Sequence, residues 1–68
     1  MHDDLTNSQL AMLIDEQIRG QNAERNRNIL KRRIIDGIHF EPLAEEFDMS
    51  PRYIRSLVRK LSDRLKIS

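Results

Sequence analysis

A chain of 68 residues allows one small domain with a thin core, and 38% apolar with 34% charged residues favours a folded helical domain over a disordered tail. The absence of cysteine excludes disulfide bonds and thiolate metal sites. No apolar run reaches about 18 residues and the start "MHDDLTNSQL" is acidic and polar, which excludes a membrane span and a signal peptide, so we expect a soluble cytoplasmic protein.

The charged residues are unevenly distributed along the chain. The formal net charge is only +1, but residues 1–20 carry four acidic side chains and one basic one, whereas residues 50–68 carry six basic side chains and one acidic one. Such an asymmetry points to an anionic partner more strongly than the total charge does. The alternative is that the basic residues form a solvated helix face.

The first predicted helix lies within residues 1–20, as an accessory segment ahead of the rest. Three residues can cap its start: Thr6, Asn7 or Ser8. One apolar stripe follows at helical spacing: Leu10, Leu13, Ile14 and Ile18. Gly20 is placed to end the helix as its C′ residue, the first residue beyond the cap. We expect the stripe to cover the second helix, partly within the monomer and, where the chain dimerises, across the dimer.

The second predicted helix begins near Asn22 and continues to Gly37, again a C′ residue. Its apolar residues are Ile29, Leu30, Ile34 and Ile35, with Ile38 just beyond. Leu30 and Ile34 lie at the centre of this set, and Ile29 and Ile35 lie to either side, which predicts the central helix of a bundle. The other face carries a basic cluster, for which DNA-backbone contact and plain solubility are equal alternatives: Arg25, Arg27, Lys31, Arg32 and Arg33.

The third predicted helix is short and covers about residues 41–47. His39 is its N-cap, an unusual residue there, and Pro42 falls in the first turn, where a missing N–H is harmless. Its apolar face consists of Leu43, Ala44 and Phe47.

The fourth predicted helix has the clearest signals. Ser50 is a strong N-cap, and Pro51 occupies the favoured first position. The predicted core stripe is Ile54, Leu57, Val58, Leu61 and Leu65. The opposite face carries Arg52, Arg55, Ser56, Arg59, Asp63 and Lys66, and one flank carries Tyr53, Lys60 and Arg64.

Only Asp48 and Met49 separate the third predicted helix from the N-cap of the fourth. Met49 is apolar and suited to fill the gap between the helices, and Ala44 is small enough to let them cross closely. These features predict a helix-turn-helix, the motif that places its second helix in the DNA major groove. We therefore expect an all-α fold, a small bundle of about four helices, in a single domain over residues 1–68.

The segment from about Glu24 to Lys66, roughly 43 of the 68 residues, resembles the fourth conserved region of bacterial housekeeping-type sigma factors and related small helix-turn-helix proteins. The apolar positions of that pattern are occupied by Leu43, Ala44, Phe47, Met49, Ile54 and Leu57. Asp48 stands where the family usually has glycine in the turn. The part from "IIDGIHFEPLAEEFDMSP" to Lys66 also resembles, more loosely, small regulators carried by phages and integrative elements.

The resemblance implies roles for individual residues. The positions of Pro51, Arg52 and Ser56 include the family's chief base readers, and those of Ser50 and His39 contact phosphates. Pro51 has no long donor, so we expect a target sequence that differs from a promoter element. The resemblance and the basic face of the fourth helix together give the base-reading candidates, which are Arg52, Tyr53, Arg55, Ser56 and Arg59. The phosphate candidates are His39, Ser50, Lys60, Arg32 and Arg33.

The other regions that a sigma factor needs do not fit within 68 residues. We therefore expect a stand-alone reader of double-stranded DNA, either a small transcriptional regulator or a mobile-element accessory protein. The alternative is a protein-interaction module that docks on RNA polymerase or another regulator. Because one helix-turn-helix buries little surface, tight DNA binding predicts a homodimer on a two-fold site.

The sequence argues against catalysis. The acidic residues of the third helix and turn have no nucleophile or pocket near them, so we expect no enzyme activity. Two histidines without cysteine give no recognisable metal spacing, and no cofactor is expected.

Overall fold

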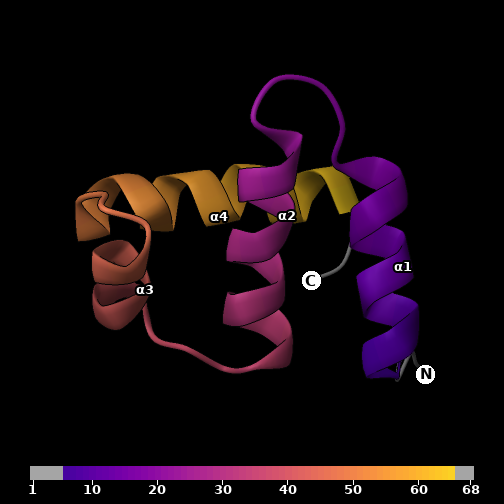
Figure 1. Ribbon diagram of the computed structural model, residues 1–68, viewed down its shortest axis with the longest axis horizontal. Helices are drawn as coiled ribbons and strands as arrows, with labels where there is room; N and C mark the ends of the chain where they lie inside the picture. Colours follow the sequence, from indigo (N-terminus) through magenta and orange to yellow (C-terminus); the bar gives the residue numbers. More distant parts are fainter. Residues whose placement is uncertain (1–5, 66–68) are drawn as a thin grey trace.

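The computed structural model describes residues 6–65, and every regular element within them is helical (Figure 1). Helix α1 spans Asn7–Gln17, and α2 spans Ala23–Leu30 and continues directly into a π-helical turn, η1, at Lys31–Ile35. Helix α3 spans Phe40–Glu46, and α4 spans Pro51–Leu65. The prediction of an all-α bundle of about four helices is confirmed. None of these helices is long and apolar enough to cross a membrane.

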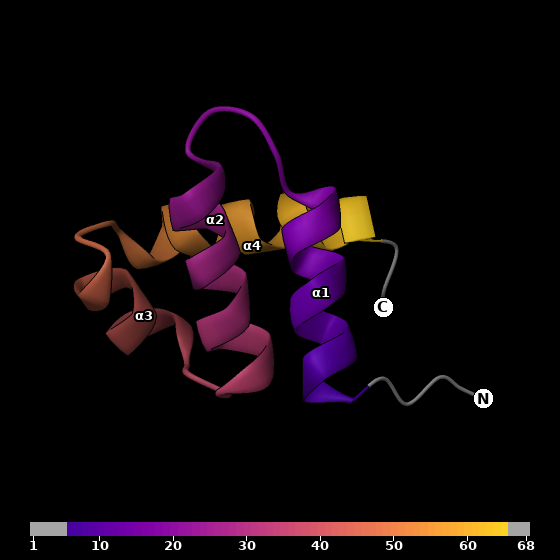
Figure 2. The same cartoon turned by 45° about the vertical axis from the view of Figure 1, so that its right-hand side comes forward.

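Helix α4 is the longest element and contacts each of the other three helices. Helices α1 and α2 lie side by side and both cross α4 on the same side, whereas α3 lies beside the start of α4 (Figures 1 and 2). The opposite side of α4 is therefore left uncovered by the helices of residues 6–65. This uncovered side carries three of the basic residues of α4: Arg52, Arg55 and Arg59.

The hydrophobic core is continuous through all four helices. Its buried residues are Ile14, Ile18, Ile29, Leu30, Leu43, Ala44, Ile54, Val58, Leu61 and Leu65. The stripes predicted for the first and fourth helices are thus confirmed, although Leu10, Leu13 and Leu57 are only half-buried. Because α1 supplies Ile14 and its C-cap Ile18 is buried beside it, α1 belongs to the core.

Helix α1 begins at a capping box. The backbone N–H of Gln9 donates to Oγ1 of Thr6 at 3.1 Å, and the N–H of Thr6 donates to Oε1 of Gln9 at 2.9 Å, which selects Thr6 among the three candidate caps. The predicted end at Gly20 is wrong, because the helix stops at Gln17 and Ile18 adopts an extended conformation. Gly20, with φ +95°, instead turns the connection to α2.

The second helix differs from the prediction in its last turn. A regular helix was expected up to Gly37, but the N–H of Asp36 donates to the carbonyl of Lys31 at 3.2 Å, five residues back, as in a π-helix. Gly37 does follow the cap with φ +73°, as expected. The wide turn moves the centre of burial to Ile29 and Leu30, and Ile34 and Ile35 are only half-buried.

The connection from α3 to α4 is a Schellman turn, in which residues after a helix donate back to its last carbonyls. The N–H of Met49 donates to the carbonyl of Ala44 at 2.8 Å, and the N–H of Asp48 donates to that of Glu45 at 3.2 Å. Asp48 has φ +58°, the left-handed conformation that this turn requires. Helix α4 then starts at Pro51, so α3 and α4 form the predicted helix-turn-helix unit.

Replacement of Asp48 by glycine is expected to leave stability unchanged or slightly raised. Glycine adopts positive φ without the steric cost of a β-carbon, a gain of roughly 1 kcal/mol, while its greater freedom in the unfolded chain costs about 0.4–1 kcal/mol. Urea unfolding of Asp48→Gly and Asp48→Ala measures this balance. Alanine keeps the β-carbon and loses the polar side chain, so Asp48→Ala should unfold at lower urea. A glycine variant less stable than the alanine variant would contradict a left-handed residue 48.

Candidate nucleic-acid interface

The uncovered side of α4 carries a stripe of polar side chains. Arg52, Arg55, Ser56 and Arg59 are spaced at i, i+3, i+4 and i+7, so they share one face of the helix over about 10 Å, and all four are exposed. The N-terminus of the helix is fixed by Ser50, whose Oγ accepts the backbone N–H of Tyr53 at 3.2 Å. Four of the five base-reading candidates are therefore adjacent on a rigid element.

A shallow groove lies along this stripe and is called here the Phe40 groove. It is lined by Phe40, Arg52, Arg55, Ser56, Val58 and Arg59. Phe40 is the first residue of α3, and two guanidinium groups lie over its ring: that of Arg33 at 4.6 Å from the centroid and that of Arg55 at 5.4 Å. These cation–π contacts join η1, α3 and α4 at the edge of the candidate interface.

Sequence reasoning missed Phe40. The residue precedes the predicted start of the third helix and does not belong to that helix's apolar face, so no periodic pattern includes it. One signal was available, because the chain has only two phenylalanines and this one directly follows the predicted N-cap His39. In the structure Phe40 is half-buried at the junction of η1, α3 and α4, where Arg33 and Arg55 lie over its ring.

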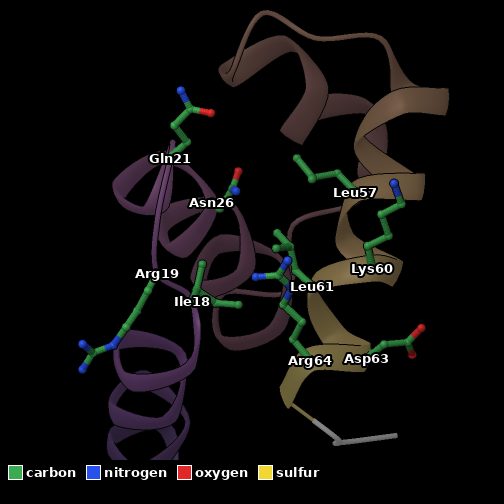
Figure 3. A pocket seen from close by; sticks show the side chains of 9 residues that line it. All are labelled: Ile18, Arg19, Gln21, Asn26, Leu57, Lys60, Leu61, Asp63 and Arg64. Carbon is green, nitrogen blue, oxygen red and sulfur yellow. The ribbon is translucent and has the colours of Figure 1, made fainter.

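The remaining base-reading and phosphate candidates occupy different surroundings. Tyr53 is 50% exposed but does not line the Phe40 groove. Lys60 lies on the other flank of α4, at a second groove that it shares with Arg64 and Leu61 (Figure 3). His39 is the exposed N-cap of α3, and its side chain makes no capping hydrogen bond. Its imidazole is thus available at the same end of α3 as the Phe40 groove.

The basic cluster predicted on the second helix is not one binding surface. Arg27 donates from Nε to the carbonyl of Ile18 at 2.7 Å, which satisfies the C-terminal end of α1. Lys31 pairs with Asp15 of α1 at 2.9 Å, and Arg25 hydrogen-bonds its neighbour Asn26. The contacts of Arg27 and Lys31 hold α1 against α2 and η1, a third role beside the two expected from the sequence.

Arg32, a phosphate candidate, is already occupied by carboxylates. Its Nη2 lies 3.0 Å from Oε1 of Glu46, its Nε also donates to Glu46, and its Nη1 lies 2.9 Å from Oδ2 of Asp36. The hydrogen bonds to Glu46, followed by those to Asp36, raise the pKa of the Arg32 guanidinium above its usual value. Arg32 therefore joins η1 to α3. Because its guanidinium is engaged by Glu46 and Asp36, we assign it no DNA contact.

If the basic residues of α4 only formed a solvated face, Arg59 would be expected to pair with Asp63, four residues later in the same helix. Both residues are exposed, and no such pair occurs among the ion pairs of residues 6–65. The guanidinium of Arg59 therefore faces solvent next to Arg52 and Ser56, in the Phe40 groove.

Replacement of Phe40 by leucine tests the junction between the three elements. Leucine keeps an apolar side chain but removes the ring, so two cation–π contacts of about 0.5–1 kcal/mol each should be lost from the unfolding free energy. Phe47→Leu is the matched control, because Phe47 is also half-buried and no cation lies over its ring within the described residues. Equal urea midpoints for the two variants would show that the contacts contribute no stability.

Residues 6–65 contain no group of three or more histidine or acidic side chains placed to hold a metal ion. Of the acidic residues in α3, Glu41 and Glu45 are exposed and only Glu46 is engaged in an ion pair within this part of the chain. No protein-family model, no curated protein and no solved structure matches the chain.

Proposed function

We propose that the chain is a sequence-specific binder of double-stranded DNA and acts without catalysis as a small transcriptional regulator or mobile-element accessory protein in the cytoplasm. One observation carries the proposal: Arg52, Arg55, Ser56 and Arg59 gather on the uncovered side of the second helix of a helix-turn-helix unit. The resemblance of residues 24–66 to the fourth region of sigma factors agrees with the same reading.

The proposed roles follow from the reach and chemistry of each side chain. An arginine fork matches O6 and N7 of guanine, so Arg52, Arg55 and Arg59 are suited to base edges in the major groove. Ser50 keeps its hydroxyl proton for a phosphate oxygen, because its Oγ only accepts from Tyr53. His39 and Lys60 lie to either side of the stripe, where the two phosphate strands of a groove would run.

Replacement of Arg52 or Arg55 by alanine should weaken binding to the preferred duplex by about 1–3 kcal/mol if that arginine reads a base, and should relax specificity at one position. Selection of bound sequences from random duplexes identifies the target, and fluorescence anisotropy measures the affinities. Arg25→Ala is the matched control, since it removes the same charge from α2, away from the Phe40 groove, where Arg25 hydrogen-bonds its neighbour Asn26. A wild-type protein with no preference for any duplex over heparin would overturn the proposal.

The second candidate function is docking on RNA polymerase or another regulator. The exposed Met12 of α1 favours it, because this apolar side chain lies away from the proposed DNA surface. Salt dependence separates the two functions. DNA affinity falls linearly on a log–log plot against salt, with a slope near −0.9 per neutralised phosphate, whereas an apolar protein contact keeps its affinity.

A further inference from the structure

The three arginines on the uncovered side of α4 differ in one respect. The guanidinium of Arg55 lies over the Phe40 ring, 5.4 Å from its centroid. Neither Arg52 nor Arg59 has such a contact with a ring within residues 6–65. In the same part of the chain, no hydrogen bond or ion pair engages any of the three guanidinium groups. Arg55 therefore combines a contact that holds its side chain with N–H groups that these residues leave available.

The Phe40 ring is itself held in place without the help of Arg55. Phe40 is half-buried and packs against the hydrophobic core. The guanidinium of Arg33 lies 4.6 Å from the ring centroid, and its Nη1 donates to the carbonyl of Ile38 at 3.4 Å. The ring is thus anchored both by η1 and by the core, and it forms a stable platform for the side chain of Arg55.

A platform of this kind affects how tightly an arginine binds a base. Immobilising one side chain with many rotamers weakens binding by about two- to tenfold. A side chain that is already held in the free protein avoids most of this loss. The cation–π contact attracts the positive charge to the face of the ring and uses none of the five N–H donors. The guanidinium of Arg55 is therefore ordered in advance and still able to donate two hydrogen bonds to one base.

We propose that Phe40 is a positioning residue that makes Arg55 the main guanine reader of the interface. The inference rests on the proposed DNA-binding function and specifies the ligand of this part of the site: a guanine whose O6 and N7 accept from the Arg55 fork. Arg52 and Arg59 must be ordered on binding, so each contributes less to discrimination between bases. The resemblance to sigma factors had pointed to Arg52 and Ser56 as readers, so this chain distributes the roles differently.

NMR relaxation of the arginine Nε–H groups tests the positioning in the free protein, without any use of DNA. The order parameter of Arg55 should exceed those of Arg52 and Arg59 in the wild type. Phe40→Leu should lower it to their level, whereas Phe40→Tyr, which keeps the ring, should preserve it. Equal order parameters for the three arginines in the wild type would overturn the proposal.

Substitution of 7-deazaguanine for each guanine of the selected duplex tests the reading, because this base lacks the N7 acceptor and keeps its base pair. At one guanine the wild type should lose at least about fivefold in affinity, and Arg55→Ala should abolish this response. Phe40→Leu should reduce the response at least about twofold at that guanine and leave the responses at other guanines unchanged. A purely structural role of Phe40 would instead lower the affinity for every duplex equally.

The outcomes separate this inference from the proposed function. With a sequence-specific wild type, the inference is overturned by a response that Phe40→Leu leaves unchanged, or by one that Arg52→Ala abolishes and Arg55→Ala does not. Circular dichroism establishes that each variant is folded, and the wild-type order parameters decide if Phe40→Leu is not. A wild type that prefers no duplex would overturn the proposed function and this inference together.

Discussion

Ile14→Ala should remove a large part of the stability of the protein. Ile14 is fully buried, and truncation of a buried isoleucine to alanine costs about 2–5 kcal/mol through lost burial and the cavity left behind. At roughly 0.05–0.15 kcal/mol per residue, a chain of 68 residues has about 3–10 kcal/mol in total. We therefore expect a much lower melting temperature and a substantial unfolded fraction at 37 °C, measured by circular dichroism.

Met12→Ala is the matched control for this substitution. It removes the same number of side-chain heavy atoms from the same helix, but Met12 is 61% exposed. Its melting curve should lie close to that of the wild type, as for most surface substitutions. Deletion of residues 1–19 should unfold the domain, because it removes both Ile14 and Ile18 from the core. If Ile14→Ala melts like Met12→Ala, α1 does not share the core of the other helices.

Ala44→Leu should be the most damaging substitution in the helix-turn-helix unit. Ala44 is 1% exposed in α3, which packs against α4, and leucine adds three carbons where no space exists. Overpacking of this kind costs about 1–3 kcal/mol or more. The variant should melt well below the wild type and lose duplex binding with it, since the α3–α4 unit then cannot keep its geometry.

Glu45→Leu provides the comparison for Ala44→Leu. It introduces the same side chain one residue later in α3, at an exposed position. Its effect should be within about 0.5 kcal/mol, as for most surface substitutions. An Ala44→Leu variant as stable as Glu45→Leu would mean that α3 and α4 do not cross closely at residue 44.

The parts of the fold that sequence predicted well are those determined by neighbouring residues. Ser50 and Pro51 specify the start of α4 through their own hydrogen bonding and φ angle, and the positive φ of Asp48 follows from its place between an ending helix and a new one. Amphipathic stripes likewise identify Ile14 and Ile54 as core residues because helical spacing is a local property.

The parts that sequence did not predict depend on partners far along the chain. The guanidinium of Arg27 reaches Ile18, nine residues away, and that of Arg32 reaches Glu46, fourteen residues away. Nothing in a helical wheel distinguishes an arginine with such a partner from a solvated one. The π-turn at Lys31–Ile35 is similarly invisible, because it depends on how the chain leaves the helix at Gly37.

The separation of charge between α4 and the rest of the described chain gives the molecule an electric dipole. Residues 51–65 carry five basic side chains and one acidic side chain, whereas residues 6–50 carry six basic and eight acidic side chains. The six basic residues of the second group lie largely against acidic or carbonyl oxygens. The basic residues of α4 are exposed, with Arg52, Arg55 and Arg59 on its uncovered side and Lys60 and Arg64 on one flank. A polyanion rotates such a molecule during diffusion so that α4 arrives first, which raises the association rate constant. That acceleration should disappear as added salt shortens the reach of the field, even where the contacts of the final complex persist.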